Sequence, residues 1–468
     1  MKLDLMNRRN FLRTSLAVAG AAMLPAARAV EAPRLIRAQP SRAALLGPDY
    51  PRTDVWTYEG GVPGPEIRLR QGERLRIELE NLLPDDTTVH WHGVRVPNAM
   101  DGVPQLTQTP IRANGGRFVY EFAVPDAGTF WYHPHLGSPE QVGRGLYGAL
   151  IVEERDPPDV DRDIVWMLGD WRLDRRARIV EDFGNFMDAS HAGRIGNSVT
   201  VNGAIRESFE LRSGERVRLR LINAANARIF GLNFRGHDPL VIALDGQPVR
   251  AHRPERGRVV LGPSMRADVL VDATGEPGST HSVIDDFYER RAYQLLDLKY
   301  SPARARGRAG TPPPKLAPNP LSEPDLASAQ RHRVRFEGGM MGRMPGGMMG
   351  GMMGGKHRMA WTVNGKALGE HDHGGEPLLT LAHRRSHVIE VVNDTSWHHP
   401  THLHGHVFRV LTRNGKPTAH REWLDTVLLD PDSRAEIAFV ADNPGDWMFH
   451  CHVLEHQASG LMAVLRVA

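Results

Sequence analysis

Eight of the 23 histidines in this 468-residue chain form four pairs that draw attention, each with one residue between its two members. The pairs are His90 and His92, His133 and His135, His402 and His404, and His450 and His452. Alternate residues of a strand face the same side, so each pair would aim two imidazoles in one direction if it lies on a strand. Imidazole is a common metal ligand, and four pairs supply more ligands than one mononuclear site can use. The pattern therefore predicts a polynuclear metal cluster.

The single cysteine, Cys451, lies between His450 and His452. Because the chain has no second cysteine, an intramolecular disulfide is excluded. Together with His399 and His456 it would supply one thiolate and two imidazoles, which is the trigonal ligand set of a blue-copper centre. On a strand, Cys451 would face one side and its two histidine neighbours the other. We therefore expect a short covalent path between a copper centre and the cluster.

A sequence repeat indicates the elements that would position these ligands. Residues 69–81 recur as 211–223 and, more weakly, as 381–393, and each copy places a turn before alternating apolar and polar residues that end in Asn. This pattern is typical of a half-buried strand. Nine and eleven residues after the terminal Asn, the outer copies have a histidine pair, whereas the middle copy has Leu232 and Phe234. We expect the two outer repeats to hold the cluster at their interface.

Helical periodicity is scarce, and short strand-like runs are separated by Gly and Pro throughout the chain. The sequence therefore predicts an all-β protein of three sandwich domains. We place these domains at residues 40–156, 160–300 and 331–468. A Pro-, Arg- and Ala-rich linker is expected at residues 301–330.

The first 29 residues have the pattern of a twin-arginine (Tat) signal peptide. Arg8 and Arg9 precede a short apolar run at 14–24, and Ala27-Arg28-Ala29 resembles a cleavage site. The apolar run is too short to span a bilayer, and no later segment is apolar enough. Removing the signal changes the formal net charge from +3 to −1, because it holds five basic residues and one acidic residue. We therefore expect export by the Tat machinery to the periplasm, no membrane span and no nucleic-acid partner.

The order and spacing of the histidine motifs resemble those of the multicopper oxidases, a family that includes laccases, ascorbate oxidase and bacterial cuprous oxidases. The resemblance covers nearly all of the mature chain and implies three cupredoxin-like Greek-key β-sandwich domains that hold four copper ions. It implies that His399, Cys451 and His456 bind the type 1 copper, and that His90 and His402 bind the type 2 copper. It further implies that the two type 3 coppers are bound by His92, His133 and His452 and by His135, His404 and His450.

The same resemblance implies the reaction and its proton donor. Four one-electron oxidations of a substrate at the type 1 copper would be coupled to the reduction of O2 to water at the cluster. Asp101 stands eleven residues after His90, where the family has an acid near the cluster, and we predict that it donates or relays protons, although a turn Asp before Gly would look the same. Bacterial relatives often have a second acid after the last type 1 histidine, and Gln457 occupies that position here.

Two further positions depart from the simplest family pattern or leave alternatives open. The family's axial residue lies ten after the cysteine, which is Leu461 here. We predict a three-coordinate type 1 copper with Leu461 above it, unless a bulge admits the adjacent Met462. Asp425 has two interpretations, as an acceptor for a ligand imidazole or as a plain surface residue of a strand.

A methionine-rich segment at residues 338–359 bears on the substrate. Eight of the 17 methionines lie between Met340 and Met359 among many glycines, and thioethers are ligands suited to Cu(I). A merely flexible or hydrophobic insertion is the alternative, and the nearby His371-Asp372-His373 could assist copper binding or be a solvated loop. Periplasmic Cu(I) oxidation in copper tolerance is our first hypothesis. The others are laccase-like oxidation of phenols or Mn(II), and copper storage without turnover.

Overall fold

The computed structural model describes residues 33–340, 359–369 and 375–468. The chain divides into Met1–Arg34, of which only Pro33 and Arg34 are described, and Leu35–Ala468, which contains every site discussed below. The predicted signal peptide at 1–29, most of the methionine-rich segment and the motif His371-Asp372-His373 lie outside the described residues. Within the described part, no helix combines the length and the apolar character needed to cross a membrane.

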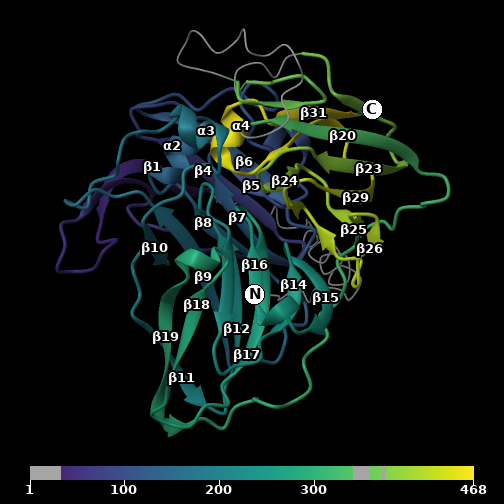
Figure 1. The fold of residues 1–468 in the computed structure, drawn as a ribbon. Coiled ribbons are helices and arrows are strands. Elements are labelled where there is room, and N and C mark those ends of the chain that lie inside the picture. Colours follow the sequence, from purple (N-terminus) through teal and green to yellow (C-terminus); the bar gives the residue numbers. More distant parts are fainter. Residues whose placement is uncertain (1–32, 341–358, 370–374) are drawn as a thin grey trace, which may run out of the picture. The chain divides into compact units, whose positions relative to one another are not determined.

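Strands form nearly all of the regular structure, and in the described chain they make six sheets (Figure 1). The first two sheets have the strand orders β2-β1-β4-β6 and β3-β8-β7-β5. Their bounds are β1 (Arg34–Ala43), β2 (Thr53–Tyr58), β3 (Ile67–Arg70), β4 (Arg74–Asn81), β5 (His90–His92), β6 (Gly116–Ala123), β7 (Gly128–His133) and β8 (Gly148–Glu153).

The middle of the chain forms the sheets β10-β9-β12-β17-β14-β15 and β11-β19-β18-β13-β16. Their bounds are β9 (Arg162–Trp171), β10 (Ser198–Val201), β11 (Ser208–Ser213), β12 (Arg216–Asn223), β13 (Phe230–Phe234), β14 (Leu240–Leu244), β15 (Gln247–His252), β16 (Val259–Leu261), β17 (Arg266–Asp272), β18 (Thr280–Asp285) and β19 (Tyr293–Arg304).

The last two sheets are β21-β20-β23-β29-β25-β26, with β27 beside β25, and β22-β31-β30-β24-β28. Their bounds are β20 (Gln330–Gly338), β21 (Trp361–Val363), β22 (Leu379–Leu381), β23 (Ser386–Asn393), β24 (His399–Leu403), β25 (Phe408–Arg413), β26 (Lys416–Pro417), β27 (Trp423–Leu424), β28 (Thr426–Leu429), β29 (Ser433–Val440), β30 (Gly445–Cys451) and β31 (Met462–Val467). Each third of the chain thus contributes two sheets, and the all-β prediction is confirmed.

The helices are short. The α-helices described are α2 (Ser138–Gly143), α3 (Phe186–Ser190) and α4 (Leu454–Ala458), and the 3-10 turns are η1 (Asn98–Met100), η2 (Glu255–Gly257) and η3 (Glu289–Arg291). Helix α4 begins three residues after Cys451 and carries His456. This short helix therefore returns His456 to the vicinity of Cys451.

All three copies of the sequence repeat form two short strands joined by a turn. The pairs are β3 and β4, β11 and β12, and β22 and β23, and the second strand of each pair ends at the repeated Asn. In each copy the buried Asn amide donates to two backbone carbonyls, and its side-chain oxygen accepts from the backbone N–H two residues later. The Asn recurs because it satisfies backbone groups that the end of a buried strand would leave without partners.

The middle repeat differs from its prediction of a half-buried strand. Every residue of β12 is buried, including Arg216, Arg218 and Arg220. These guanidiniums face carboxylates, so the polar side of the strand is covered by protein. The alternation of apolar and polar residues identified the strand correctly but not the burial of its polar side, because a paired charge can be buried as completely as a leucine.

The linker predicted at residues 301–330 begins later than expected, because a strand covers its first residues. Strand β19 continues to Arg304, and β20 begins at Gln330, so residues 305–329 are the part without helix or strand. The segment from Tyr293 to Arg304 pairs with β18 and β11, although its last residues are Pro- and Arg-containing. Pro302 lies where the register with β11 shifts, between the pairs Leu211–Tyr300 and Ser213–Arg304, and a bulge tolerates a proline because its missing N–H is not needed by a neighbour.

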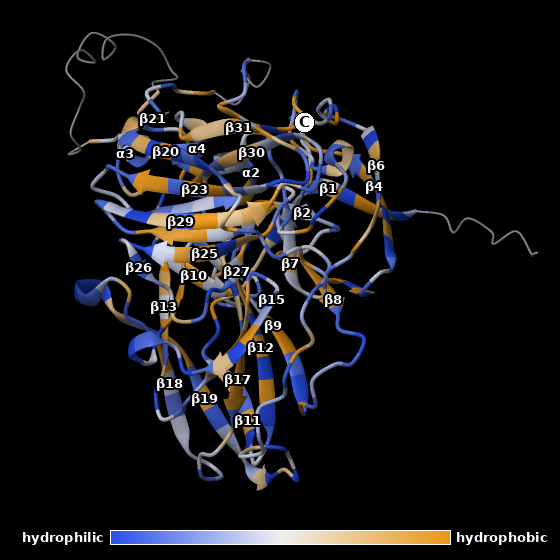
Figure 2. Cartoon of the chain, turned by 90° about the vertical axis from the view of Figure 1, so that its right-hand side faces the viewer, coloured by the Kyte–Doolittle hydropathy of each residue, from blue (hydrophilic) through white to orange (hydrophobic). Residues whose placement is uncertain are grey.

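The outer repeats share one hydrophobic cluster, which contains Trp91 and Phe122 from the first and Trp447 and Phe449 from the last. The middle repeat has its own cluster, which includes Leu219. Hydrophobic and hydrophilic residues alternate along strands such as β12 (Figure 2). Each fully buried large apolar side chain contributes about 1.5–3 kcal/mol. The shared cluster indicates that the first and last thirds of the chain pack directly against each other.

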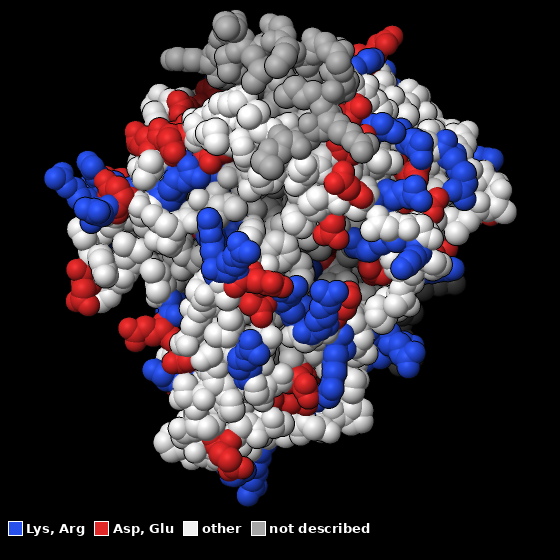
Figure 3. Space-filling model, viewed as in Figure 1, with Lys and Arg blue, Asp and Glu red and all other residues white. Residues whose placement is uncertain are grey.

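On the face shown in Figure 3, basic and acidic side chains are interspersed. The charge balance of the sequence is therefore not separated into one basic and one acidic area on this face. Interspersed charges of both signs screen one another and produce weak fields beyond a Debye length.

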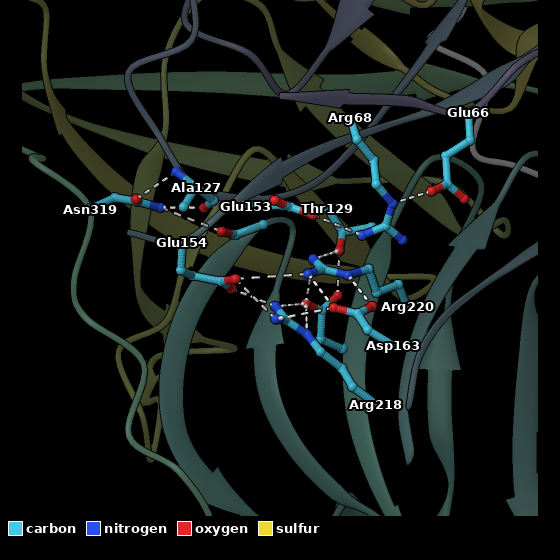
Figure 4. Close-up of polar contacts among 12 residues, drawn as sticks. Glu66, Arg68, Ala127, Thr129, Glu153, Glu154, Asp163, Arg218, Arg220 and Asn319 are labelled. Atoms are coloured by element: carbon cyan, nitrogen blue, oxygen red, sulfur yellow. Dashed lines mark hydrogen bonds and ion pairs between the residues drawn. The ribbon is translucent and has the colours of Figure 1, made fainter. Parts of the chain in front are cut away.

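The buried arginines of β12 allow a test of how the sheets are held together. Arg218 donates to Glu154 at 2.7 Å and to Asp268 at 2.5 Å, and its side chain is fully buried (Figure 4). We expect Arg218→Met to lower the free energy of unfolding by about 3–5 kcal/mol, because it leaves two buried carboxylates short of a partner. The measurement is the denaturant midpoint.

Arg74→Met serves as the control. Arg74 forms an exposed ion pair with Glu121, and its loss should cost less than about 1 kcal/mol. Equal midpoints for the two variants would contradict the role of the buried network.

Candidate metal centres

Two strand pairs bring most of the predicted ligands together. Strand β5 pairs with β7 so that His90 lies opposite His133, and β24 pairs with β30 so that His402 lies opposite His450. The two pairs occupy equivalent places in the first and last thirds of the chain, which matches the registers of the repeats. Each pair thus presents histidines from two neighbouring strands to one side.

The prediction that each histidine pair lies on a strand is correct only for His90 and His92, both within β5. In the other pairs the second histidine comes after the strand has ended: β7 ends at His133, β24 at Leu403 and β30 at Cys451. Pro134 explains one of these ends, because proline cannot donate to a sheet ladder. The second imidazoles are therefore positioned by the turns that follow the strands.

The eight histidines of the pairs form three groups, two of which share His92, and within each group the candidate ligand atoms lie within 4.8 Å of one another. Each group contains residues from both ends of the chain, and all members are buried. The groups are His90, His92 and His402; His92, His133 and His452; and His135, His404 and His450. The arrangement can hold a cluster of metal ions between the first and last thirds of the chain.

Backbone carbonyls determine which nitrogen is free in four of the eight imidazoles. The Nδ1 atom of His90 contacts the carbonyl of Asp101 at 2.8 Å, and that of His402 contacts the carbonyl of Asp425 at 2.9 Å. His133 and His450 make the same kind of contact, at 2.9 Å and 2.8 Å. A carbonyl only accepts, so each Nδ1 carries the proton and each Nε2 keeps its lone pair. A neutral imidazole of this tautomer is ready to bind a metal.

The inward nitrogens lack protein partners that would explain their burial. Among the described residues, the buried Nε2 atoms of His90, His133 and His402 have no hydrogen-bond partner, and neither nitrogen of His452 has one. Burial lowers the pKa of His133 and His452 well below its ordinary value, so these rings are neutral. Buried polar atoms without partners are rare, and bound metal ions would satisfy one nitrogen of each of these rings.

The cysteine site is separate from the cluster and has the predicted members. The Nδ1 atom of His399 lies 3.3 Å from Cys451 Sγ, and that of His456 lies 3.7 Å from it. The opposite nitrogens are held by the Thr395 hydroxyl at 2.8 Å and the His191 carbonyl at 2.6 Å. Burial raises the pKa of the Cys451 thiol, so a bound cation is what would make it a thiolate.

Leu461 and Met462 occupy opposite sides of the chain. Leu461 belongs to the buried cluster that contains Cys451, and its carbonyl accepts from the Cys451 N–H at 3.0 Å. Met462 lies opposite His450 across the strands and packs with Val103 and Met448. No register shift interrupts the pairing of β30 with β31. The regular pairing shows no bulge at Met462, and the axial role of Leu461 stays a prediction.

Asp101 lies against the cluster, where it was expected. Its carboxylate is fully buried and accepts from His404 Nδ1 at 2.9 Å, while His404 Nε2 lies 3.0 Å from His450 Nε2. One residue therefore contacts two histidines, His90 through its carbonyl and His404 through its carboxylate. Gln457 lies 3.4 Å from His135 Nε2 and is also buried.

Asp425 is not the surface residue that one interpretation proposed. It is fully buried between β27 and β28, and its carboxylate accepts from His92 Nε2 at 3.2 Å. The guanidinium of Arg266 on β17 donates to both carboxylate oxygens, at 2.8 Å and 2.5 Å. Burial alone would raise the pKa of Asp425, but Arg266 and His402 outweigh it and the net shift is downward.

Sequence reasoning missed Arg266 and Asp245. Asp245 accepts from the backbone N–H groups of Arg266 and Thr426, and burial and the Asp425 carboxylate raise its pKa to about 7. Both residues come from the middle third of the chain, which has no histidine pair at the repeat positions. Neither residue has a recognisable sequence spacing to the histidines, so only the tertiary structure shows that they lie near the cluster.

Comparison with known families gives matches along most of the chain. Three family models described as multicopper oxidase match residues 42–157, 162–295 and 349–468. A model of the twin-arginine translocation signal matches residues 5–25. The chain is 31% identical to the multicopper oxidase MmcO of Mycobacterium tuberculosis, over 90% of this chain and 84% of that protein.

Two further relatives are informative. A copper resistance protein A homolog of Pseudomonas syringae pv. tomato is 26% identical, over 88% of both chains. The crystal structure of a multi-copper oxidase from Pseudomonas thermotolerans superposes with a TM-score of 0.84 at 36% identity, covering 94% of this chain and all of that one. The similarity therefore includes the whole arrangement of sheets around the two candidate centres.

The cysteine site can be tested without affecting the cluster. We expect Cys451→Ser to lose the strong visible absorption of a copper–thiolate bond and to bind about one copper ion fewer per chain, because a hydroxyl is a poor substitute for thiolate. Visible spectra and metal analysis of the purified protein measure both effects. A variant that keeps the parent's visible band would show that Cys451 is not a ligand.

Proposed function

The chain belongs to the multicopper oxidase family, and from its two centres we propose that it couples four one-electron oxidations of a substrate to the reduction of O2 to water. The protein is a copper-binding oxidoreductase. Four bound copper ions would supply the capacity to collect four electrons, so that O2 is reduced without release of partly reduced species. The observation that supports this proposal is the set of buried imidazoles whose lone pairs converge in groups from both ends of the chain.

We assign the ligands as the family pattern implies. His399, Cys451 and His456 would hold the type 1 copper, and His90 and His402 the type 2 copper. The type 3 coppers would be held by His92, His133 and His452 and by His135, His404 and His450. The convergence of these groups supports the assignment. Because Cys451 is bonded through the chain to His450 and His452, its backbone is the shortest covalent connection between the two centres.

Protons for water formation would come through Asp101. Its carboxylate lies at the cluster and contacts the Nδ1–H of His404, so it can exchange a proton without leaving its place. Gln457 has no acidic proton to give. Asp101 is therefore the acid that we propose for the relay.

We expect Asp101→Asn to lower kcat by about 10²–10⁴-fold, the usual contribution of general acid catalysis, and to change the pH dependence of turnover. The measurement is oxygen consumption as a function of pH, with copper content as the control. Turnover and pH profile like those of the parent, at equal copper content, would rule out the relay.

Cu(I) is the substrate that we propose first, for an enzyme of copper tolerance in the periplasm. The chain that leads into the methionine-rich segment is fixed beside the cysteine site: the Met340 N–H donates to Ser190, and Trp397 Nε1 donates to the Met340 carbonyl at 2.9 Å. The adjacent His191 carbonyl is the group that holds His456. The copper resistance relative and the Tat signal support this choice.

A laccase-like oxidation of phenols or Mn(II) is the second candidate, and Leu461 at the axial place favours it. Copper storage without turnover is the third, and oxygen consumption distinguishes it from both oxidases. Steady-state kinetics of the copper-loaded protein on Cu(I), Mn(II) and a phenol, side by side, decide among the three.

Replacing thioethers by isosteric apolar side chains tests the role of the methionine-rich segment. We expect leucine at six positions to lower kcat/KM for Cu(I) about tenfold, equivalent to roughly 1.4 kcal/mol of lost binding, and to leave phenol oxidation unchanged. The positions are Met341, Met344, Met348, Met349, Met352 and Met353. Equal losses on both substrates would indicate a structural segment only.

A further inference from the structure

We propose that Arg266, in the middle third of the chain, is a positioning residue for the copper cluster, and that it acts through Asp425 on His92 and His402. The inference rests on the proposed function, since it concerns the ligands of that cluster. None of the ligands assigned above comes from the middle third, yet this arginine lies one residue away from the cluster imidazoles. It would give the middle third a direct part in forming the centre.

Asp425 is the point where the three thirds of the chain meet. Its side chain contacts His92, from the first third, at 3.2 Å, and its own carbonyl holds His402, from the last third, at 2.9 Å. Both carboxylate oxygens accept from Arg266, and one of them also accepts from the Thr426 hydroxyl at 2.8 Å. A carboxylate with this many donors has a single favourable orientation.

His92 differs from the other cluster imidazoles in the nitrogen that contacts the protein. Among the cluster histidines, five donate from Nδ1 to an oxygen, namely His90, His133, His402, His404 and His450. His92 is reversed, because its Nε2 contacts Asp425 and Thr426 while its buried Nδ1 has no hydrogen-bond partner. The carboxylate therefore selects the tautomer that leaves the Nδ1 lone pair of His92 free for a metal.

Arg266 is held as firmly as the carboxylate that it orients. Its side chain is fully buried, and it donates from Nε to the Thr129 carbonyl at 3.1 Å and from Nη1 to the Ser264 carbonyl at 3.3 Å. Its backbone N–H donates to Asp245 at 3.0 Å. The guanidinium thus donates in its own plane to four acceptor atoms of three residues, which a lysine could not reproduce.

The contact with Thr129 extends the network into the buried ion pairs of β12. The Thr129 hydroxyl donates to Asp268 at 2.6 Å and accepts from Arg220 at 3.0 Å, and Arg218 also donates to Asp268, at 3.1 Å. Figure 4 shows Thr129, Arg218 and Arg220 in this network. Next to Thr129, a Cβ on Gly128 would lie 2.1 Å from the carbonyl oxygen of Gly246, so only glycine permits this approach of the two backbones. The position of Arg266 therefore depends on close packing of the first and middle thirds.

The test compares Arg266→Met with Arg216→Met. Arg216 is a matched control, because it is an equally buried arginine on the adjacent strand, and it donates to both oxygens of Asp272 without contacting any residue of the cluster. We expect Arg266→Met to weaken copper binding at the cluster by about 10–100-fold while the blue copper–thiolate band remains. We expect Arg216→Met to keep the parent's copper content and electron paramagnetic resonance spectrum.

Copper per chain, the visible band and the type 2 signal are measured on the purified holoprotein, together with kcat and KM for the reducing substrate. The expected kinetic result is a lower kcat with an unchanged KM, since the substrate is oxidised at the other centre. Full loading of Arg266→Met with the parent's spectrum would overturn the inference, and so would equal copper loss in both arginine variants.

Asp425→Asn keeps the test decisive if Arg266→Met does not fold. This variant is isosteric and retains one oxygen acceptor, and we expect it to alter the type 2 signal and to lose cluster copper selectively. An unaltered signal at full copper content would contradict the positioning role. A parent protein that holds well under four coppers after reconstitution would instead refute the proposed function, so the two failures are distinguishable.

Discussion

The structure depends on one repeated interaction: a hydrogen bond from the outer nitrogen of a buried imidazole to a protein oxygen. Backbone carbonyls of Asp101, Pro134, Asp425 and Cys451 accept most of these bonds. Each one fixes the tautomer and the ring orientation, so the other nitrogen presents a lone pair to the centre. Burial lowers the pKa of His133 and His402 below its ordinary value, and without the outer bond these rings would be free to turn or to exchange tautomers.

The accepting carbonyls come from two kinds of place. Pro134 and Cys451 directly follow the histidines that they hold, whereas Asp101 and Asp425 lie in other segments that pack against the ligand strands. Cross-strand pairing of β5 with β7 and of β24 with β30 places the histidines of neighbouring strands opposite each other, and the first and last thirds of the chain share one apolar cluster. Rigid sheets therefore convert a sequence spacing into a geometry suited to metal ions.

The middle third of the chain lacks histidine pairs at the repeat positions but is not a passive spacer. Its strand β12 buries three arginines, and its strand β17 places Arg266 against Asp425. Buried ion pairs are costly to form and costly to break one-sidedly, so they favour one packing arrangement of neighbouring elements over others. In this molecule that arrangement determines where a carboxylate meets His92 and His402, which links the docking of the sheets to the order of the cluster.

The sequence by itself determined the all-β fold, the repeat and the histidines that the structure brings together, because strand periodicity and histidine spacing are local patterns that survive without knowledge of packing. Asp101 and Leu461 could also be located from motif spacing. The tertiary structure alone decided that β12 is buried on both sides, that three histidine pairs extend past their strands, that Asp425 is internal, and that Arg266 reaches the cluster. The contacts of β12 and of Asp425 join residues far apart in the sequence, such as Arg218 with Glu154 and Arg266 with Asp425, and the type and spacing of a residue do not record which distant partner will cover it.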